Sequence, residues 1–308
     1  MNWLENPPTK ATVRFCLWIH MSLIFSLDLN RPSSAPAIPN DEIVLEGNLG
    51  RTVILLHGLT GTPNEMRYLA FTLNKQGYRV ICPRLANHGE PLHVLKRTTW
   101  EDLYEPLRAS FMEELASGNK VYVAGLSMSA LFVLLLAEEF QEKLAGGICL
   151  APTLFFDGWN VPWYNSLLPL AANTPLKYCL YFKENPPYGI KNERIRAMVH
   201  RYYGRARLDD IEQIAKYGYA FFPVSLFHQL QRLTRTVIPL LGRINAPLLL
   251  IHPQEDDTAS VRNSELIYGR ISSPVKQLVI LTDSYHVITA DQEREKVGRV
   301  MIEFLDPL

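Results

Sequence analysis

One serine lies where an apolar strand-like stretch gives way to an apolar helix-like stretch, a setting in which a hydroxyl can act as a nucleophile. Ser127 occupies the third position of the pattern G-x-S-x-S, between Gly125 and Ser129. A sharp strand-to-helix turn strains the serine backbone and lifts its hydroxyl above the sheet, and it needs small neighbours on either side. The alternative is a serine that only caps the following helix.

A serine hydroxyl becomes reactive when a base removes its proton and an acid orients that base. Asp256 and His286 lie in two later loops, each directly after a strand-like stretch, with the acid first in the chain. Asp257 is an alternative acid, because one residue of register cannot be resolved from a loop sequence. Asp283 precedes His286 in the same loop and is more typical of a local turn.

Acyl chemistry also needs two backbone N–H groups that bind the negative charge of the tetrahedral intermediate. Met128, directly after the serine, supplies one of them in this interpretation. Leu59, in the glycine-rich segment HGLTGTP at residues 57–63, is the expected second donor. Gly58 and Gly61 keep that segment bendable, and His57 is expected to brace it.

The remaining histidines do not form a metal-binding pattern. His88 and His93 share a loop without metal-ligand spacing, His252 ends an apolar strand and is interpreted as a core residue or a neighbour of the site, and HExxH, HxH and CxxC are absent. GxGxxG and GxxxxGK[ST] are absent as well. The sequence therefore predicts no metal and no nucleotide cofactor.

The elements that would position these residues alternate between short apolar strands and helices. Expected strands lie at residues 51–58, 78–83, 120–125, 146–152, 246–253 and 275–281, and expected helices at 63–76, 98–116, 128–140, 261–270 and 291–304. Strands that are apolar on both faces indicate a mostly parallel, doubly wound sheet covered by helices. Its carboxyl edge would carry Ser127, Asp256 and His286 together.

The alternation stops over residues 153–243, which are rich in proline and aromatic side chains. We interpret this segment as a helical cap inserted between core segments 41–152 and 244–308, with helices expected near 192–203 and 208–216. Its aromatic residues suit a lid over an apolar group, although each could instead pack only within the lid. These residues are Phe155, Phe156, Trp159, Trp163, Tyr164, Phe221, Phe222 and Phe227.

Residues 1–40 are interpreted as a leader outside the core. Lys10 and Arg14 precede a 13-residue apolar run at 15–27, which is too short to span a bilayer. A cleaved signal peptide, a flexible leader and a true start at Met21 are all compatible with this segment. Of these, a flexible leader is the interpretation we favour.

Composition excludes several classes of function. The 308 residues are 47% hydrophobic, and 31 basic residues balance 31 acidic ones, so no overall field attracts nucleic acid or acidic membrane surfaces. A small molecule is the expected partner, and the sequence does not indicate an oligomeric state. Four cysteines without close pairing suggest neither a disulfide framework nor a zinc site, which is compatible with a cytoplasmic location.

The segments HGLTGTP, GLSMS, EDD and SYHVITADQE together resemble those of α/β-hydrolases, most closely small bacterial carboxylesterases and monoacylglycerol lipases. The resemblance runs from about residue 51 to the end. In those carboxylesterases the acid lies thirty residues before the histidine, which favours Asp256 over Asp257. The resemblance implies a triad of Ser127, Asp256 and His286, with Leu59 and Met128 as oxyanion donors.

The chain departs from this family pattern at two small residues. Ser129 stands where the serine motif usually has glycine, and Asn87 begins NHG where the family has GHG. The expected function is a serine hydrolase that cleaves carboxylic esters of short to medium acyl chains, monoacylglycerol-like substrates included, through an acyl-enzyme. A thioesterase or acyltransferase with the same triad, or an inactive α/β-hydrolase that serves as a binding protein, is the alternative.

Overall fold

A computed structural model describes residues 22–25, 42–162, 165, 167–206, 214 and 218–308. These residues form a central seven-stranded sheet in the order β10-β9-β6-β5-β3-β4-β2. All neighbouring strands are parallel except β2, which pairs with β4 in the antiparallel direction. The strands are β2 (Ile43–Leu45), β3 (Arg51–Leu56), β4 (Arg79–Cys82), β5 (Lys120–Leu126), β6 (Gly146–Leu150), β9 (Leu248–Pro253) and β10 (Lys276–Leu281).

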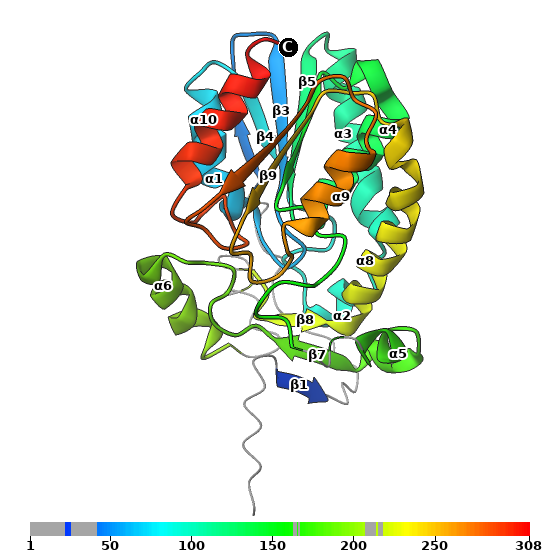
Figure 1. The fold of residues 1–308 in the computed structure, drawn as a ribbon. Coiled ribbons are helices and arrows are strands. Elements are labelled where there is room, and N and C mark those ends of the chain that lie inside the picture. The colour runs from blue at the N-terminus through cyan, green and yellow to red at the C-terminus, as the bar shows by residue number, and fades with distance from the viewer. Residues whose placement is uncertain (1–21, 26–41, 163–164, 166, 207–213, 215–217) are drawn as a thin grey trace, which may run out of the picture.

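Helices cover both faces of this sheet, as the sequence predicted (Figure 1). Along β3 the apolar residues alternate between two cores: Val53 and Leu55 pack beneath α1 and α10, whereas Ile54 and Leu56 pack toward α3, α4 and α8. A continuous apolar run is what a strand buried on both sides requires. The helices around the sheet are α1 (Arg67–Asn74), α3 (Trp100–Ala116), α4 (Ser129–Phe140), α8 (Val224–Val237), α9 (Arg262–Arg270) and α10 (Arg294–Leu305).

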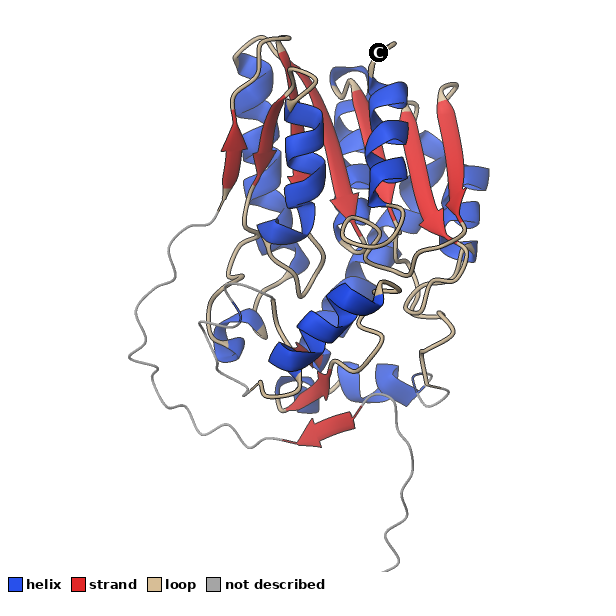
Figure 2. Ribbon diagram, turned by 90° about the vertical axis from the view of Figure 1, so that its left-hand side faces the viewer, coloured by secondary structure: helices blue, strands red, loops and turns tan. Residues whose placement is uncertain are grey.

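The expected cap, residues 153–243, divides in two: α8 packs against α3 and α4 beside the sheet, and the described residues before it lie at the carboxyl ends of the parallel strands (Figure 2). The cap is not purely helical, because β7 (Leu180–Lys183) pairs with β8 (Phe221–Pro223) in an antiparallel sheet. Part of the leader joins this sheet, since β1 (Ser22–Phe25) pairs with β7; the rest of residues 1–40 lies outside the described residues. The helix expected at 208–216 also lies outside the described residues, apart from Ile214. The expected helix at 192–203 is α6 (Glu193–Tyr203).

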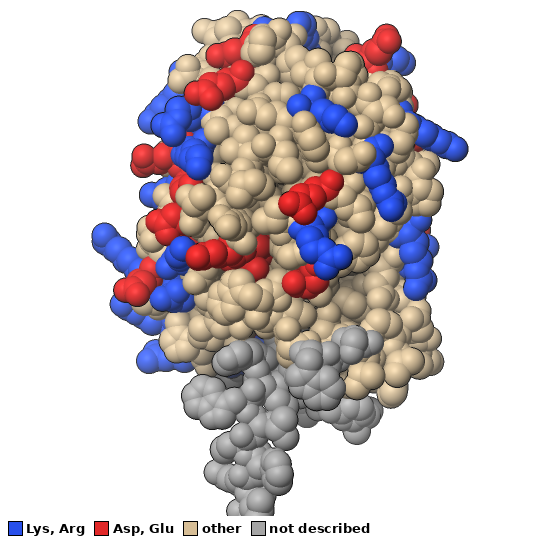
Figure 3. All heavy atoms as spheres, in the orientation of Figure 1, with Lys and Arg blue, Asp and Glu red and all other residues tan. Residues whose placement is uncertain are grey.

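Short elements complete the chain between the longer ones. They are α2 (Leu92–Leu95), α5 (Leu168–Ala172), η1 (Pro63–Met66), η2 (Gln141–Lys143), η4 (Pro175–Tyr178) and η5 (Ile238–Arg243). On the face shown in Figure 3, basic and acidic side chains are interspersed, in keeping with the balanced composition. Among the described residues, no helix combines the length and apolar character needed to cross a membrane.

The order of the strands brings the functional loops together. The chain runs from β3 to β4 on one side and then to β5 on the other, so the loops after β3 and β5 leave the sheet side by side. Such a switch in direction opens a crevice at the carboxyl edge, where α/β sheets bind ligands. Ser127 follows β5, and residues 57–62, called the β3 loop below, follow β3.

Candidate active site

Ser127 has the strained backbone of a nucleophile elbow, the sharp turn between a strand and a helix. Its φ is 58°, in the left-handed region that residues other than glycine rarely adopt. Its N–H donates to the carbonyl of Leu150 over 2.9 Å, which ties the turn to β6. A Cβ at Gly125 would overlap the backbone of Ser129, which explains the glycine two positions before the serine.

The structure brings Ser127, His286 and Asp256 into one hydrogen-bonded line. Ser127 Oγ lies 2.9 Å from His286 Nε2, and His286 Nδ1 lies 2.8 Å from Asp256 Oδ2. With the Nδ1 proton donated to the carboxylate, Nε2 is left as an acceptor for the serine proton. The arrangement has the geometry of a nucleophile, a general base and an orienting acid.

Asp256 is held as a charged group although it is buried. Its Oδ1 accepts the N–H groups of Thr258 (2.8 Å) and Ala259 (2.7 Å), while His252 Nε2 lies 3.4 Å from Oδ2. Burial alone would raise the pKa of this carboxyl, but the charge of His286 and hydrogen bonds from His252 and His286 hold it below its ordinary value. Burial lowers the pKa of His286, but the charge and hydrogen bond of Asp256, together with the charges of Asp257 and Glu65, raise it above its ordinary value.

Asp257 lies beside this line with a different set of contacts. Its carboxylate accepts the backbone N–H groups of Gly189 (3.1 Å) and His286 (3.3 Å). Burial and the adjacent charge of Asp256 raise the pKa of Asp257 to about 6. Asp257 therefore fixes backbone around the histidine, whereas Asp256 contacts the imidazole ring.

Leu59 and Met128, the expected oxyanion donors, both line the cavity into which Ser127 opens. His57 is buried as expected: its Nδ1 lies 2.8 Å from the carbonyl of Gly58, and its Nε2 accepts the N–H of Leu85. Burial lowers the pKa of His57 well below its usual value, so the ring is neutral and braces the β3 loop.

His88 has a structural role that the sequence reasoning missed. Its Nε2 lies 2.6 Å from the carbonyl oxygen of Leu59, so it holds the residue expected to donate to the oxyanion. The signal available in the sequence was its place in NHG, the segment similar to the family's GHG. Asn87 of that segment has a φ of 60°, which asparagine tolerates better than most residues, and this accounts for the replacement of glycine.

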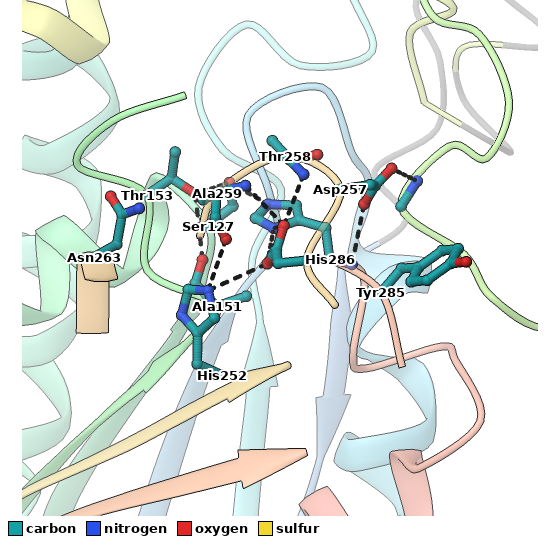
Figure 4. Close-up of polar contacts among 12 residues, drawn as sticks. Ser127, Ala151, Thr153, His252, Asp257, Thr258, Ala259, Asn263, Tyr285 and His286 are labelled. Carbon is teal, nitrogen blue, oxygen red and sulfur yellow. Dashed lines mark hydrogen bonds and ion pairs between the residues drawn. The ribbon is translucent and has the colours of Figure 1, made fainter. Parts of the chain in front are cut away.

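Thr153 also contacts the nucleophile without having been predicted. Its buried Oγ1 lies 3.2 Å from Ser127 Oγ and 3.3 Å from the carbonyl of Ala151 (Figure 4). The hydroxyl can donate to either oxygen. It follows β6 in a stretch that carries no catalytic pattern, so only the fold reveals its proximity to Ser127.

A cavity of about 330 Å³ opens at Ser127 and extends beneath the cap. Much of its lining is apolar: Phe156, Leu168, Phe182, Phe222, Phe227 and Leu230. Three of the aromatic residues expected to cover the substrate do not line the cavity. The side chains of Phe155 and Trp159 are exposed to solvent, and Phe221 is buried elsewhere in the protein. Trp163 and Tyr164 lie outside the described residues.

Two carboxyl groups on the cavity wall were not predicted. Glu65 and Glu184 come from η1 and from the segment after β7. Burial raises the pKa of each to about 7, with the charge of Asp257 contributing at Glu184. Within the part of the chain that the structure describes, no group of three or more histidine, cysteine, aspartate or glutamate side chains is arranged to hold a metal ion.

Known proteins are similar to this chain in sequence and in fold. The chain is 28% identical to a thermostable monoacylglycerol lipase of Bacillus sp. (strain H-257), covering 82% of this chain and 89% of the lipase. It is 27% identical to a carboxylesterase of Bacillus subtilis (strain 168), covering 84% and 93%. A solved structure from work on the metagenome-derived lipolytic enzymes LipS and LipT superposes with a TM-score of 0.72 at 25% identity, covering 89% of this chain and all of that one.

A protein family profile also matches this chain, over a range that includes the turn at Ser127 and the strands of the central sheet except β2. Residues 47–293 match the profile of the family described as serine aminopeptidase, S33. That range contains most of both core segments and the whole cap. The chain therefore belongs to the serine aminopeptidase S33 family and is a carboxylesterase- and lipase-like α/β-hydrolase.

Proposed function

We propose that this protein is a serine hydrolase that cleaves carboxylic esters of short to medium acyl chains, monoacylglycerol-like esters among them. The observation that carries the proposal is the hydrogen-bonded line from Ser127 through His286 to Asp256, which opens on a largely apolar cavity. The names of the two Bacillus relatives, a monoacylglycerol lipase and a carboxylesterase, support the same substrate class.

In the first half of the reaction, the Ser127 hydroxyl transfers its proton to His286 Nε2 as Oγ bonds to the ester carbonyl carbon. Asp256 stabilises the imidazolium that forms. The carbonyl oxygen becomes negatively charged and is bound by the N–H groups of Leu59 and Met128. As the intermediate collapses, His286 returns the proton to the leaving alcohol, the carbon–oxygen bond breaks, and an acyl-Ser127 ester remains.

In the second half, water replaces the alcohol. His286 removes a proton from water, the hydroxyl oxygen bonds to the acyl carbon, and the intermediate collapses with the proton passing to Ser127 Oγ. The carboxylic acid then leaves. The apolar side chains that line the cavity, Phe156 and Leu230 among them, provide the environment for the acyl chain. Each methylene group buried there contributes about 0.8 kcal/mol to binding.

The decisive experiment combines turnover with covalent labelling of the full chain. We expect hydrolysis of p-nitrophenyl esters to exceed that of acyl-thioesters of equal chain length, and a fluorophosphonate to form an adduct that peptide mapping places on Ser127. Ser127→Ala should lose both signals while keeping its thermal unfolding transition.

Other outcomes identify the alternatives. Preference for thioesters, or transfer of the acyl group to an added alcohol in place of water, would replace the esterase assignment by a thioesterase or an acyltransferase with the same triad. Absence of turnover together with absence of the Ser127 adduct would instead identify a binding protein.

A further inference from the structure

Glu65 lies at the start of the first helical segment after the β3 loop and turns its carboxyl group back onto that loop. Its Oε2 accepts the backbone N–H of Gly58 over 3.0 Å. A Cβ at Gly61 would overlap the Glu65 carboxyl, so the carboxyl packs directly against the loop backbone. A Cβ at Gly58 would lie 3.5 Å from Glu65 Oε2 and 3.9 Å from the Cβ of Ser127. The carboxyl therefore packs on the loop, and Gly58 lies close to both the carboxyl and Ser127.

The peptide group that joins His57 to Gly58 is held at both of its polar atoms. Its carbonyl oxygen accepts the hydroxyl of Ser129 over 2.6 Å, and its N–H donates to Glu65. One contact comes from the helix that follows the nucleophile and the other from η1. Together they fix the plane of this peptide relative to the elbow.

The next peptide, between Gly58 and Leu59, carries the N–H that is expected to bind the oxyanion. Its carbonyl oxygen lies 2.8 Å from His57 Nδ1 and accepts the N–H of Gly61 over 3.1 Å. Because the C=O and N–H of a trans peptide point in opposite directions, these contacts direct the Leu59 N–H away from the loop's own polar atoms. If the peptide between His57 and Gly58 rotated, the direction of the Leu59 N–H would change as well.

We propose that Glu65 is a positioning residue for the oxyanion site: by accepting the Gly58 N–H, it holds the β3 loop so that the Leu59 N–H points at the developing negative charge. This role rests on the proposed ester hydrolysis. A carboxylate is a stronger acceptor than a neutral oxygen, and the contact is made before substrate arrives. Glu65 thus contributes to the preorganisation on which oxyanion stabilisation depends.

The test compares Glu65→Leu with Glu65→Gln in the full chain at about pH 8.5, using p-nitrophenyl butyrate. Removing an oxyanion donor outright costs roughly 10²- to 10³-fold in kcat, so loss of its positioning in Glu65→Leu should lower kcat by about 10- to 100-fold, with little change in KM. The amide oxygen introduced by Glu65→Gln still accepts an N–H, and kcat of this variant should stay within about threefold of the wild type. Affinity for a trifluoromethyl ketone, which forms an oxyanion adduct, should fall in parallel with kcat.

Glu184→Leu is the comparison for cavity charge, because it removes another carboxyl group from the wall of the same cavity; its kcat should fall by less than that of Glu65→Leu. If it reproduced the loss of kcat, charge in the cavity and not the loop contact would be responsible, and the proposal would be wrong. Equal losses in Glu65→Gln and Glu65→Leu would also overturn it, as would full kcat in Glu65→Leu. Glu65→Ala replaces Glu65→Leu if the latter fails to fold.

A measurement that needs no turnover separates this proposal from the proposed function. The backbone amide resonance of Leu59 and its hydrogen-exchange rate should change in Glu65→Leu and stay near the wild-type values in Glu65→Gln. An unchanged Leu59 amide in Glu65→Leu would overturn the positioning role. If the wild type hydrolysed no ester while the Leu59 amide changed as expected, the proposed function would fail and the loop contact would stand.

Discussion

The hydroxyl of Ser129 lies 2.6 Å from the carbonyl oxygen of His57, and both residues are fully buried. Glycine is the usual residue at this position of the elbow, so the side chain of Ser129 has to fit into a tight turn. The tight approach in this elbow is to Gly125, which meets the backbone of Ser129 and not its side chain. Ser129 therefore fits the turn and ties α4 to the β3 loop.

Replacing Ser129 by the usual glycine should lower the free energy of unfolding of this protein. Ser129→Gly leaves the buried carbonyl of His57 without its donor, which costs roughly 1 to 3 kcal/mol, and places a flexible residue at the first position of α4. Ser129→Ala removes the hydroxyl alone and isolates the hydrogen bond. Urea unfolding should give a lower free energy of unfolding for both variants; a glycine variant as stable as the wild type would show that the contact does not contribute.

Most of the fold could be predicted because its elements are encoded locally. Long apolar runs identified the parallel strands, and the first turn of α3 was recognisable from its acidic residues. There Thr99 and Asp102 form a reciprocal capping box, in which each side chain bonds to the other's backbone N–H. The order of strands and helices then restricts the sheet to few topologies.

Other features depend on contacts between distant residues and could not be predicted. β7 and β8 are four and three residues long, so they are too short to show a strand pattern of their own. These two segments are strands because they pair with each other in the folded cap. The choice between Asp256 and Asp257 could not be derived from the loop sequence either, because only the folded loop decides which carboxylate turns toward the histidine ring.

The two adjacent aspartates should respond differently to the same substitution. Asp256→Asn removes the charge that orients and stabilises the His286 ring, and we expect kcat to fall by roughly 10⁴-fold, as the equivalent change does in a serine protease. Asp257→Asn keeps one of the two oxygens that accept backbone N–H groups and leaves the contact between Asp256 and the His286 ring in place, so kcat should fall by less than about tenfold. Steady-state kinetics of both variants decides the matter, and the reverse order would make Asp257 the acid.

The pH dependence of turnover should report the pKa of His286. The ring must be neutral to accept the serine proton, so kcat/KM should fall as the pH drops through this pKa. Burial alone would lower the pKa, but the charge of Asp256 and its hydrogen bond raise it above the ordinary 6.5. We therefore expect the acidic limb of the profile to have its midpoint above pH 6.5.

The same profile has an internal control. In the residual activity of Asp256→Asn, the midpoint should move to lower pH, because burial then acts on the ring without the largest of the charges that oppose it. Profiles of both proteins over about pH 5 to 9 with a p-nitrophenyl ester are sufficient. A wild-type midpoint at or below 6.5, or a shift in the opposite direction, would rule out this assignment of the base.

The aromatic wall of the cavity should set the preferred acyl length. Phe156 and Phe227 stack with ring centroids 5.6 Å apart, and both line the cavity. Phe227→Ala would open space for several more methylene groups, each contributing about 0.8 kcal/mol when buried. The kcat/KM ratio of a dodecanoyl to a butanoyl p-nitrophenyl ester should therefore rise by about tenfold or more. Phe155→Ala, a change at an exposed ring beside Phe156, should leave the ratio unchanged; equal ratios in both variants would mean that the acyl chain lies elsewhere.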